Sequence, residues 1–222
     1  MLRNKVNNCG MHKCSYFILL ILSYSSVHSL PMGYKNSTMM MGSINDSQIT
    51  TDLNYALTSS SALGVRLLYV DIDNQSPQLL KEASFTHRLI RANEPNSQSN
   101  LWFFGGIGNL ASTDSSSEST TTYSPGFQLD YETRRIYMSI YNRMLRGKHV
   151  NHDVARIKGG FSFYKTGYNR TQPWFIMEIS HMNGVKETTQ FVPTLRLINK
   201  NLYVELGINQ KAKPNIGLMY LF

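Results

Sequence analysis

Residues Leu202 to Asn209 read LYVELGIN, and this stretch decides the fold class. Leu202 and every second residue after it are apolar, whereas the residues between them are Tyr, Glu, Gly and Asn. Side chains alternate between the two faces of a β-strand, so a period of two predicts a strand with one apolar and one polar face. The same alternation runs through 49–57, 123–132 and 155–164.

Weaker alternation of the same kind covers the rest of the chain after residue 36, and helical spacing fits none of it. If every connection is a hairpin and both ends of the sheet lie on the same side, the number of strands must be even. Ten strands is therefore the alternative to the twelve predicted here. The twelve predicted strands are 37–44, 48–57, 62–71, 80–91, 100–110, 121–132, 136–145, 154–164, 173–182, 188–198, 202–209 and 215–222.

The connections between these strands differ in length. Short turns on one side and longer loops on the other are typical of an outer-membrane β-barrel. Two connections, 92–99 and 165–172, are long where this rule requires a tight turn. The tight connections are 58–61, 133–135 and 199–201, and the longer polar ones are 71–78, 111–120, 146–153, 183–187 and 210–215.

The first segment, residues 1–29, is predicted to be a signal peptide and not part of the fold. Basic residues precede the apolar run YFILLIL at 16–22, and the segment 27–29 (VHS) offers a small residue at the cleavage point. The run is too short for a membrane-spanning helix, which needs about 20 residues. Cleavage would remove both cysteines, Cys9 and Cys14, and three of the 22 basic residues, leaving 19 against 14 acidic residues and a charge of +5.

Three features favour a transmembrane barrel over a soluble β-sandwich. The strands approach the roughly 9–11 residues that a tilted strand needs to cross a bilayer, whereas strands in soluble proteins are commonly about 5–6 residues long. Residues 217–222 (GLMYLF) end on Phe222 and resemble the C-terminal signature that the outer-membrane insertion machinery reads. Aromatic residues near strand ends suit the girdles at the two membrane interfaces; they are Tyr123, Tyr131, Phe161, Phe163, Trp174, Phe175 and Tyr220.

We therefore predict an all-β fold for residues 30–222, an up-and-down transmembrane β-barrel in the bacterial outer membrane. The mean hydropathy of −0.28 is then an average over one lipid-facing and one water-facing side. Such a barrel would be structural or would form a narrow channel for small solutes or ions, without a cofactor. The competing class is a secreted soluble barrel similar to lipocalins, whose apolar residues would line a pocket for a small apolar ligand. A barrel enzyme acting on lipid is the third class.

The polar face of the predicted strands holds most of their charged residues, which we expect to face the barrel lumen. A Lys or Arg turned toward mid-bilayer lipid would cost about 2–4 kcal/mol, so these charges fix the register of each strand. The acidic candidates are Asp52, Glu82, Asp130, Glu132, Glu178 and Glu205, and the basic candidates are Arg66, Arg88, Arg143, Arg156, Lys158 and Arg196.

One charge pair can be located from the sequence. If residues 200–201 form a two-residue hairpin loop, Arg196 lies opposite Glu205, and Leu195 lies opposite Leu206 on the apolar face. The preferred interpretation is an interior salt bridge that stabilises the barrel. A constriction that selects solutes is the alternative.

Six short motifs carry a resemblance to a known family: MMMG at 39–42, DYET at 130–133, NHD at 151–153, GFSFY at 160–164, QPWF at 172–175 and LRLINK at 195–200. With them the chain resembles a family of poorly characterised proteobacterial outer-membrane β-barrel proteins over most of residues 30–222. The resemblance implies an outer-membrane location and brings no catalytic residue with it.

A metal site is a weaker possibility. His149, His152 and Asp153 share a predicted outer loop, where imidazole and carboxylate groups could bind a divalent ion. Spacing on a loop is a weak signal, so a polar loop without metal is preferred. The three methionines at 39–41 could offer thioethers to copper(I), but strand neighbours point to opposite faces, which favours packing or lipid contact.

An enzymatic site can be weighed at Ser180-His181, which invites comparison with outer-membrane phospholipases. Adjacent strand residues face opposite ways, so these two side chains cannot form a nucleophile–base pair with each other. No enzymatic activity is predicted.

Two partners are predicted and one class is excluded. Lipopolysaccharide phosphates in the outer leaflet suit basic loops, and the insertion machinery would read the C-terminal strand ending at Phe222. A secreted barrel does not meet nucleic acid, despite the +8 charge of the full chain. The basic residues of the predicted outer loops are Arg146, Lys148, Lys186, Lys211 and Lys213.

Overall fold

The computed structural model describes residues 32–72, 76–113, 119–167, 169–185 and 188–222, which form strands joined by turns and loops. The predicted signal peptide lies outside the described residues. In the described ranges, no helix is long and apolar enough to cross a membrane. The strands are β1 (Thr38–Ile44), β2 (Gln48–Ala56), β3 (Ser61–Val70), β4 (Gln78–Asn93), β5 (Ser97–Ser112), β6 (Thr120–Tyr123), β7 (Gly126–Thr133), β8 (Ile136–Gly147), β9 (Val150–Ser162), β10 (Gln172–Asn183), β11 (Thr188–Asn199), β12 (Leu202–Ile208) and β13 (Pro214–Leu221).

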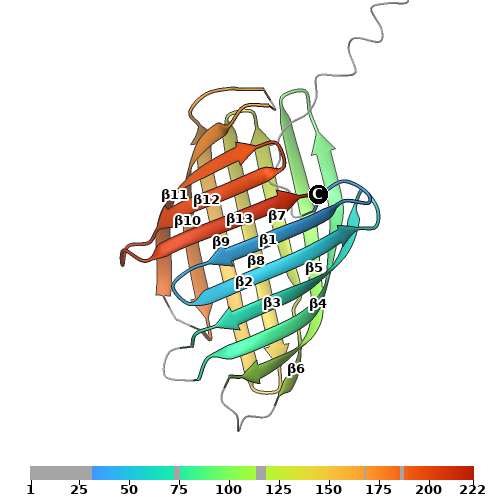
Figure 1. Ribbon diagram of the computed structural model, residues 1–222, viewed down its shortest axis with the longest axis vertical. Coiled ribbons are helices and arrows are strands. Elements are labelled where there is room, and N and C mark those ends of the chain that lie inside the picture. Colours follow the sequence, from blue (N-terminus) through green and yellow to red (C-terminus); the bar gives the residue numbers. More distant parts are fainter. Residues whose placement is uncertain (1–31, 73–75, 114–118, 168, 186–187) are drawn as a thin grey trace, which may run out of the picture.

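These strands form one closed antiparallel sheet (Figure 1). β1 pairs with β13 and so closes the ring. β6 and β7 both pair with β5 on one side and β8 on the other, because the strand is interrupted at Ser124 and Pro125, where proline has no amide to donate. They count as one barrel strand, so the prediction of a twelve-stranded up-and-down barrel is confirmed.

The connections differ from the sequence expectation in two places. The predicted loop 146–153 is wrong, because the ladder continues until Gly147 pairs with Val150 and leaves only a two-residue turn. The connection predicted at 92–99 is also short, since β4 extends to Asn93 and β5 begins at Ser97. The connection 163–171 remains long. The short turn at 148–149 reduces the difference in length between the two ends of the barrel, whereas the short connection after Asn93 restores a tight turn where the rule requires one.

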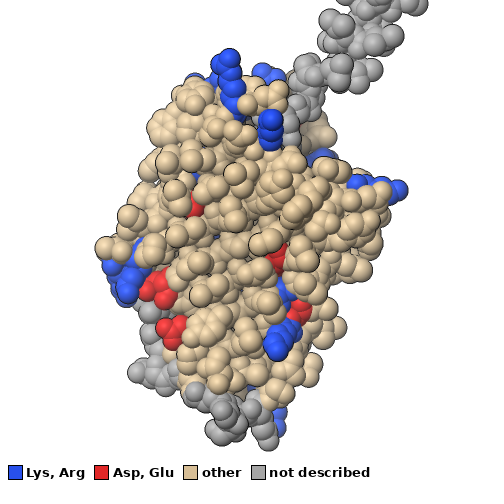
Figure 2. All heavy atoms as spheres, in the orientation of Figure 1, with Lys and Arg blue, Asp and Glu red and all other residues tan. Residues whose placement is uncertain are grey.

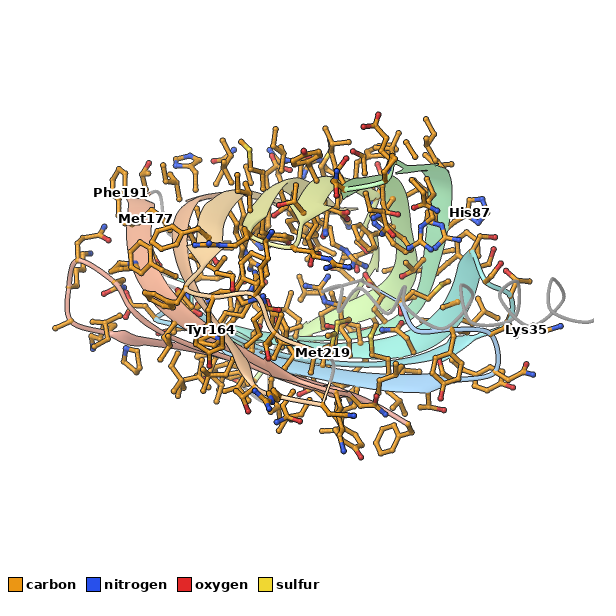
Figure 3. The ribbon with its side chains drawn as sticks, turned by 90° about the horizontal axis from the view of Figure 1, so that it is seen from above. Lys35, His87, Tyr164, Met177, Phe191 and Met219 are labelled. Carbon is orange, nitrogen blue, oxygen red and sulfur yellow. The ribbon has the colours of Figure 1, made fainter. Side chains whose placement is uncertain are left out.

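Apolar side chains face outward around the ring. Leu53, Leu129 and Ile140 are 45%, 50% and 55% exposed, whereas the inward neighbours Asp130 and Ser139 are 4% and 6% exposed. On the face shown in Figure 2, residues other than Lys, Arg, Asp and Glu form most of the surface, and the basic side chains lie mainly at its margins. Seen from above, side chains project both outward and into the space that the strands enclose (Figure 3).

The ladder between β11 and β12 has the predicted register. Arg196 pairs with Glu205 and Leu195 pairs with Leu206, with a two-residue loop between the strands. Lys200 adopts a positive φ of 52° in that loop. This strand pair therefore presents its charged pair to the lumen and the Leu195–Leu206 pair to the outside.

The prediction that Trp174 belongs to an outward aromatic girdle is wrong. Its side chain is 2% exposed and packs inside the barrel with Tyr137, Ile176 and Ile198. Trp174 lies opposite Arg196 in the β10–β11 ladder, and residues paired across a ladder point to the same face. The tryptophan must therefore face the lumen whenever Arg196 does.

The lumen is apolar near both ends, a feature that the alternation of the sequence does not indicate. At the other end of the barrel from the Trp174 cluster, apolar side chains gather where β3, β5, β8 and β10 finish. The buried residues of this cluster are Leu68, Val70, Ile72, Leu80, Leu110, Leu145, Met182 and Val185. A further apolar cluster, toward the end of the barrel that holds Trp174, consists of Met32, Ala56, Ala62, Trp102 and Phe104. Most of the lumen-facing charged side chains therefore lie in a layer between these clusters, although Arg88 and Asp130 contact Trp102.

Candidate functional site

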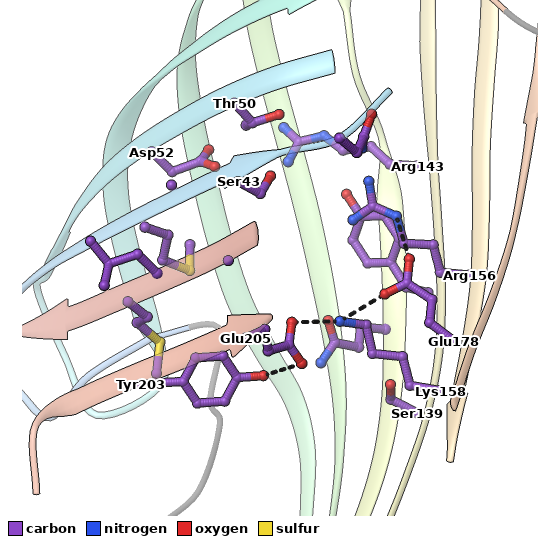
Figure 4. A pocket seen from close by; sticks show the side chains of 18 of the residues that line it. Ser43, Thr50, Asp52, Ser139, Arg143, Arg156, Lys158, Glu178, Tyr203 and Glu205 are labelled. Carbon is purple, nitrogen blue, oxygen red and sulfur yellow. Dashed lines mark hydrogen bonds and ion pairs between the residues drawn. The ribbon is translucent and has the colours of Figure 1, made fainter. Parts of the chain in front are cut away.

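The middle of the lumen holds a cavity of about 260 Å³ whose wall carries both signs of charge (Figure 4). Side chains from strands on opposite sides of the barrel line it, so the closed sheet itself creates the site. Eight of the twelve charged residues predicted to face the lumen contribute to its wall. They are Asp52, Arg66, Arg143, Arg156, Lys158, Glu178, Arg196 and Glu205.

On one side of the cavity, four charged side chains form a continuous network. Lys158 Nζ lies 2.9 Å from Glu205 Oε2 and 3.0 Å from Glu178 Oε2. Arg196 donates to Glu205 Oε1 at 2.8 Å, and the Tyr203 hydroxyl donates to the same oxygen at 2.7 Å. The ladders create this network, because Lys158 is paired with Glu178 and Arg196 with Glu205.

The Arg196 guanidinium contacts two aromatic rings in addition to making its hydrogen bonds. Its central carbon lies 4.2 Å from the Tyr137 ring centroid and 5.0 Å from that of Tyr203. A guanidinium placed over aromatic faces gains cation–π attraction, which grows as water is excluded. The arginine is 2% exposed, so this end of the network is rigidly held and its charge is compensated.

Across the barrel, Glu82 organises a second group around Arg143, although Glu82 does not itself line the cavity. Its side chain is 0% exposed, and its carboxylate accepts hydrogen bonds of 2.5 Å from both the Ser124 hydroxyl and Arg143 Nη2. Gly106 makes this position possible, since a Cβ there would collide with the Glu82 carboxylate. The interruption between β6 and β7 brings Ser124 into the lumen beside the ion pair.

Two arginines in the cavity wall are less well compensated. Arg66 is opposite Asp52 in the β2–β3 ladder, but its Nε lies 3.7 Å from that carboxylate and makes no hydrogen bond. Arg156 Nε lies 3.9 Å from Glu178, whose other oxygen is held by Lys158. These separations are too long for hydrogen bonds. The Arg156 side chain is 27% exposed and can contact a solute, whereas Arg66 Nε is buried without a hydrogen-bond partner among the described residues.

The other predicted lumen residues lie outside this cavity. Asp130 is buried and accepts hydrogen bonds from Asn100 at 2.6 Å and from the Trp102 indole at 2.8 Å. Arg88 lies over the Trp102 ring at 5.5 Å. Glu132 is half-buried near the end of β7. Sequence alternation therefore assigns a face to these residues but not a depth along the barrel.

Several polar residues of the site do not appear among the charged candidates. Tyr137, Tyr141 and Tyr203 line the cavity, and Ser124 bridges Glu82 and Arg143. The tyrosines could have been found by the same alternation, since each shares the parity of the charged residues on its strand. Ser124 could not, because it lies in the interruption of the strand.

The weak metal candidates do not assemble. His149 is exposed in the turn after β8, with φ 62°, while Asp153 pairs with Arg146 at 2.7 Å. Within the described residues, no three His, Cys, Asp or Glu side chains come together as ligands. His152 instead lines a small cavity inside the barrel.

The other sequence candidates separate onto two faces. Ser180 is 3% exposed and faces the lumen, while His181 on the outer face contacts the Thr189 hydroxyl at 3.3 Å, so the two do not meet. Met39 is buried and Met40 is 42% exposed, as strand alternation requires.

No known protein family and no curated protein matches this chain. Among solved structures, the chain is similar to the KdgM porin in complex with disordered oligogalacturonate, with a TM-score of 0.48 and 15% identity over 84% of this chain and 99% of that chain. A second KdgM porin structure has a TM-score of 0.48 and 13% identity over the same shares. OmpTdeltaL8, a loop L8 deletion mutant of an outer membrane protein of Vibrio cholerae, has a TM-score of 0.35 and 10% identity over 84% of this chain and 97% of that chain. The resemblance to a proteobacterial family drawn from the sequence motifs stays a prediction.

Proposed function

We propose that this chain is an outer-membrane β-barrel whose charged lumen forms a narrow passage for small solutes or ions. One observation carries the proposal: the apolar faces of the strands lie on the outside of the ring, and the charged faces enclose a cavity of about 260 Å³. This distribution is the reverse of a soluble protein, in which burial of apolar side chains drives folding.

The apolar exterior supports a lipid environment. Contiguous exposed apolar patches on soluble monomers rarely exceed a few hundred Å². Here large apolar side chains are exposed on most of the strands, including Val65, Ile157 and Ile216 at 56%, 53% and 40%. Water around such a surface would be unfavourable, and hydrocarbon would not. A closed sheet also satisfies its own backbone hydrogen bonds, as a bilayer requires.

The lipocalin-like alternative requires the opposite arrangement. A soluble binder of apolar ligands would direct its apolar residues into the central pocket. The central cavity is instead lined by arginines, carboxylates and tyrosines, as at Arg66, Glu205 and Tyr141. The geometry therefore favours the membrane barrel.

Two partners belong to the proposal. Phe222 is 58% exposed next to Tyr220, with ring centroids 4.9 Å apart, so the terminal aromatic is accessible to the insertion machinery. At the other end of the barrel, Lys148, Lys211 and Lys213 are exposed and could contact lipopolysaccharide phosphates. Arg146 is engaged by Asp153, and Lys186 lies outside the described residues.

Conductance tests the passage. Purified full-length protein in planar bilayers is expected to give discrete current steps, because the cavity is polar and wide enough for water. Arg196→Ala should lower thermal stability, since it leaves Glu205 with fewer partners. Absence of current from folded protein, with Arg196→Ala affecting only stability, would overturn the passage and leave a structural barrel.

A further inference from the structure

We infer that the lumen contains a binding site for a small monovalent anion such as chloride, formed by Arg66, Arg143 and Arg156 beside His152. These four side chains line a second, smaller cavity of about 30 Å³. A cavity of about 10–15 Å³ already admits one water molecule, so this one suits a small ion and excludes a bulky one. The three arginines also line the central cavity and so connect the two spaces.

Charge is the first argument for an anion. Arginine stays protonated at every accessible pH, so the cluster carries three positive charges. Glu82 compensates Arg143 directly at 2.5 Å. Asp52 and Glu178 are 3.7 Å and 3.9 Å from the other two guanidiniums, beyond hydrogen-bond distance. The three carboxylates balance the three arginines in number, but none of them lines the small cavity, whose wall among the described residues is therefore positively charged.

Unpaired polar atoms are the second argument. Arg66 Nε and both ring nitrogens of His152 are buried and make no hydrogen bond within the described part of the chain. Buried polar atoms in native proteins nearly always have a partner. Arg66 and His152 both line the small cavity, so an occupant placed there would lie close to these atoms. The guanidinium donors require an acceptor, which an anion supplies and a cation does not.

The surroundings isolate the site from bulk water on one side. Leu68, Leu80 and Leu145 line the small cavity and belong to the apolar cluster at that end of the lumen. Electrostatic attraction strengthens where water is excluded, and rings of Arg or Lys commonly select anions in pores. The ion would therefore reach the arginines from the central cavity.

Binding can be measured without any current. Full-length protein in detergent is heated in sodium chloride or in sodium gluconate at equal concentration, so that only the anion differs. Chloride should raise the unfolding midpoint above gluconate by a few degrees, because a ligand that binds only the folded state stabilises it. In Arg66→Gln and Arg156→Gln the chloride effect should disappear. It should persist in Lys200→Gln, which removes one positive charge from an exposed turn.

Ion selectivity is the second readout, and this readout rests on the proposed passage. In a potassium chloride gradient, wild type should favour chloride, and Arg66→Gln should lower the permeability ratio roughly fivefold, the factor given by one unit charge at about 4 Å in water. Equal midpoints in chloride and gluconate for wild type would overturn the anion site, whatever the current. A chloride-specific midpoint without conductance would support the site and refute the passage. If Arg66→Gln fails to fold, Arg156→Gln and His152→Leu decide the result in the same way.

Discussion

Replacing Glu82 with alanine is expected to lower the free energy of unfolding by about 3–5 kcal/mol, because it leaves a buried charge without its counter-ion. Among the described residues, Arg143 Nη2 would lose its ion pair and keep only the Ser124 hydroxyl as a hydrogen-bond partner. Urea unfolding of the protein in lipid vesicles, followed by the shift between folded and unfolded gel mobility, measures this loss.

Two further variants test whether the burial of the ion pair causes this loss of stability. Glu94→Ala removes a carboxylate from the exposed turn after β4, and it should change stability by less than about 0.5 kcal/mol. The double variant Glu82→Leu/Arg143→Met removes both charges and should recover much of the lost stability, because a well-packed apolar pair can replace a buried ion pair. Equal effects of Glu82→Ala and Glu94→Ala would contradict the burial of this ion pair.

The second large effect is expected on the outer face. Leu129→Arg should destabilise the barrel in lipid vesicles by about 2–4 kcal/mol, because the arginine would face the middle of the bilayer. Leu129 is 50% exposed and lies between Leu101 and Ile140 in adjacent strands, all on the apolar side. Urea unfolding in vesicles provides the measurement.

The neighbouring residue gives a matched control. Gln128 precedes Leu129 on β7 but lines the central cavity, where its amide approaches Asp130 at 3.4 Å. Gln128→Arg adds the same side chain to the lumen next to a carboxylate, so its cost should be much smaller. If Leu129→Arg and Gln128→Arg lower the free energy of unfolding equally, the two faces of β7 do not differ in the way proposed.

The fold was predictable because the alternation of apolar and polar residues has the same period as a strand. Once that period is recognised, the positions of the charged residues predict which face of each strand points into the lumen. The two-residue loop at 200–201 then fixes the pairing of Arg196 with Glu205. The prediction needed only neighbouring residues in the sequence. Twelve strands and an even parity followed from counting these segments.

The contacts within the site could not be predicted, because they depend on where each residue lies along the barrel axis and on which residues face it across the lumen. Alternation along one strand does not contain this information. Glu82 and Arg143 are 61 residues apart, and they meet only because the sheet closes and a strand interruption brings Ser124 beside them. The turn at 148–149 was missed because polar residues continue the ladder beyond the apolar segment. Trp174 was assigned to the outside by residue type, although its ladder partner Arg196 faces inward.

Quenching of tryptophan fluorescence by brominated phospholipids tests the membrane barrel most directly. The chain has two tryptophans, and Trp102 and Trp174 are 0% and 2% exposed inside the barrel. In vesicles, the wild-type emission should therefore be quenched weakly, whereas Leu129→Trp should add emission that is quenched strongly. Strong quenching of the wild type, or no quenching of the added tryptophan, would contradict a barrel with lipid outside and a polar lumen within.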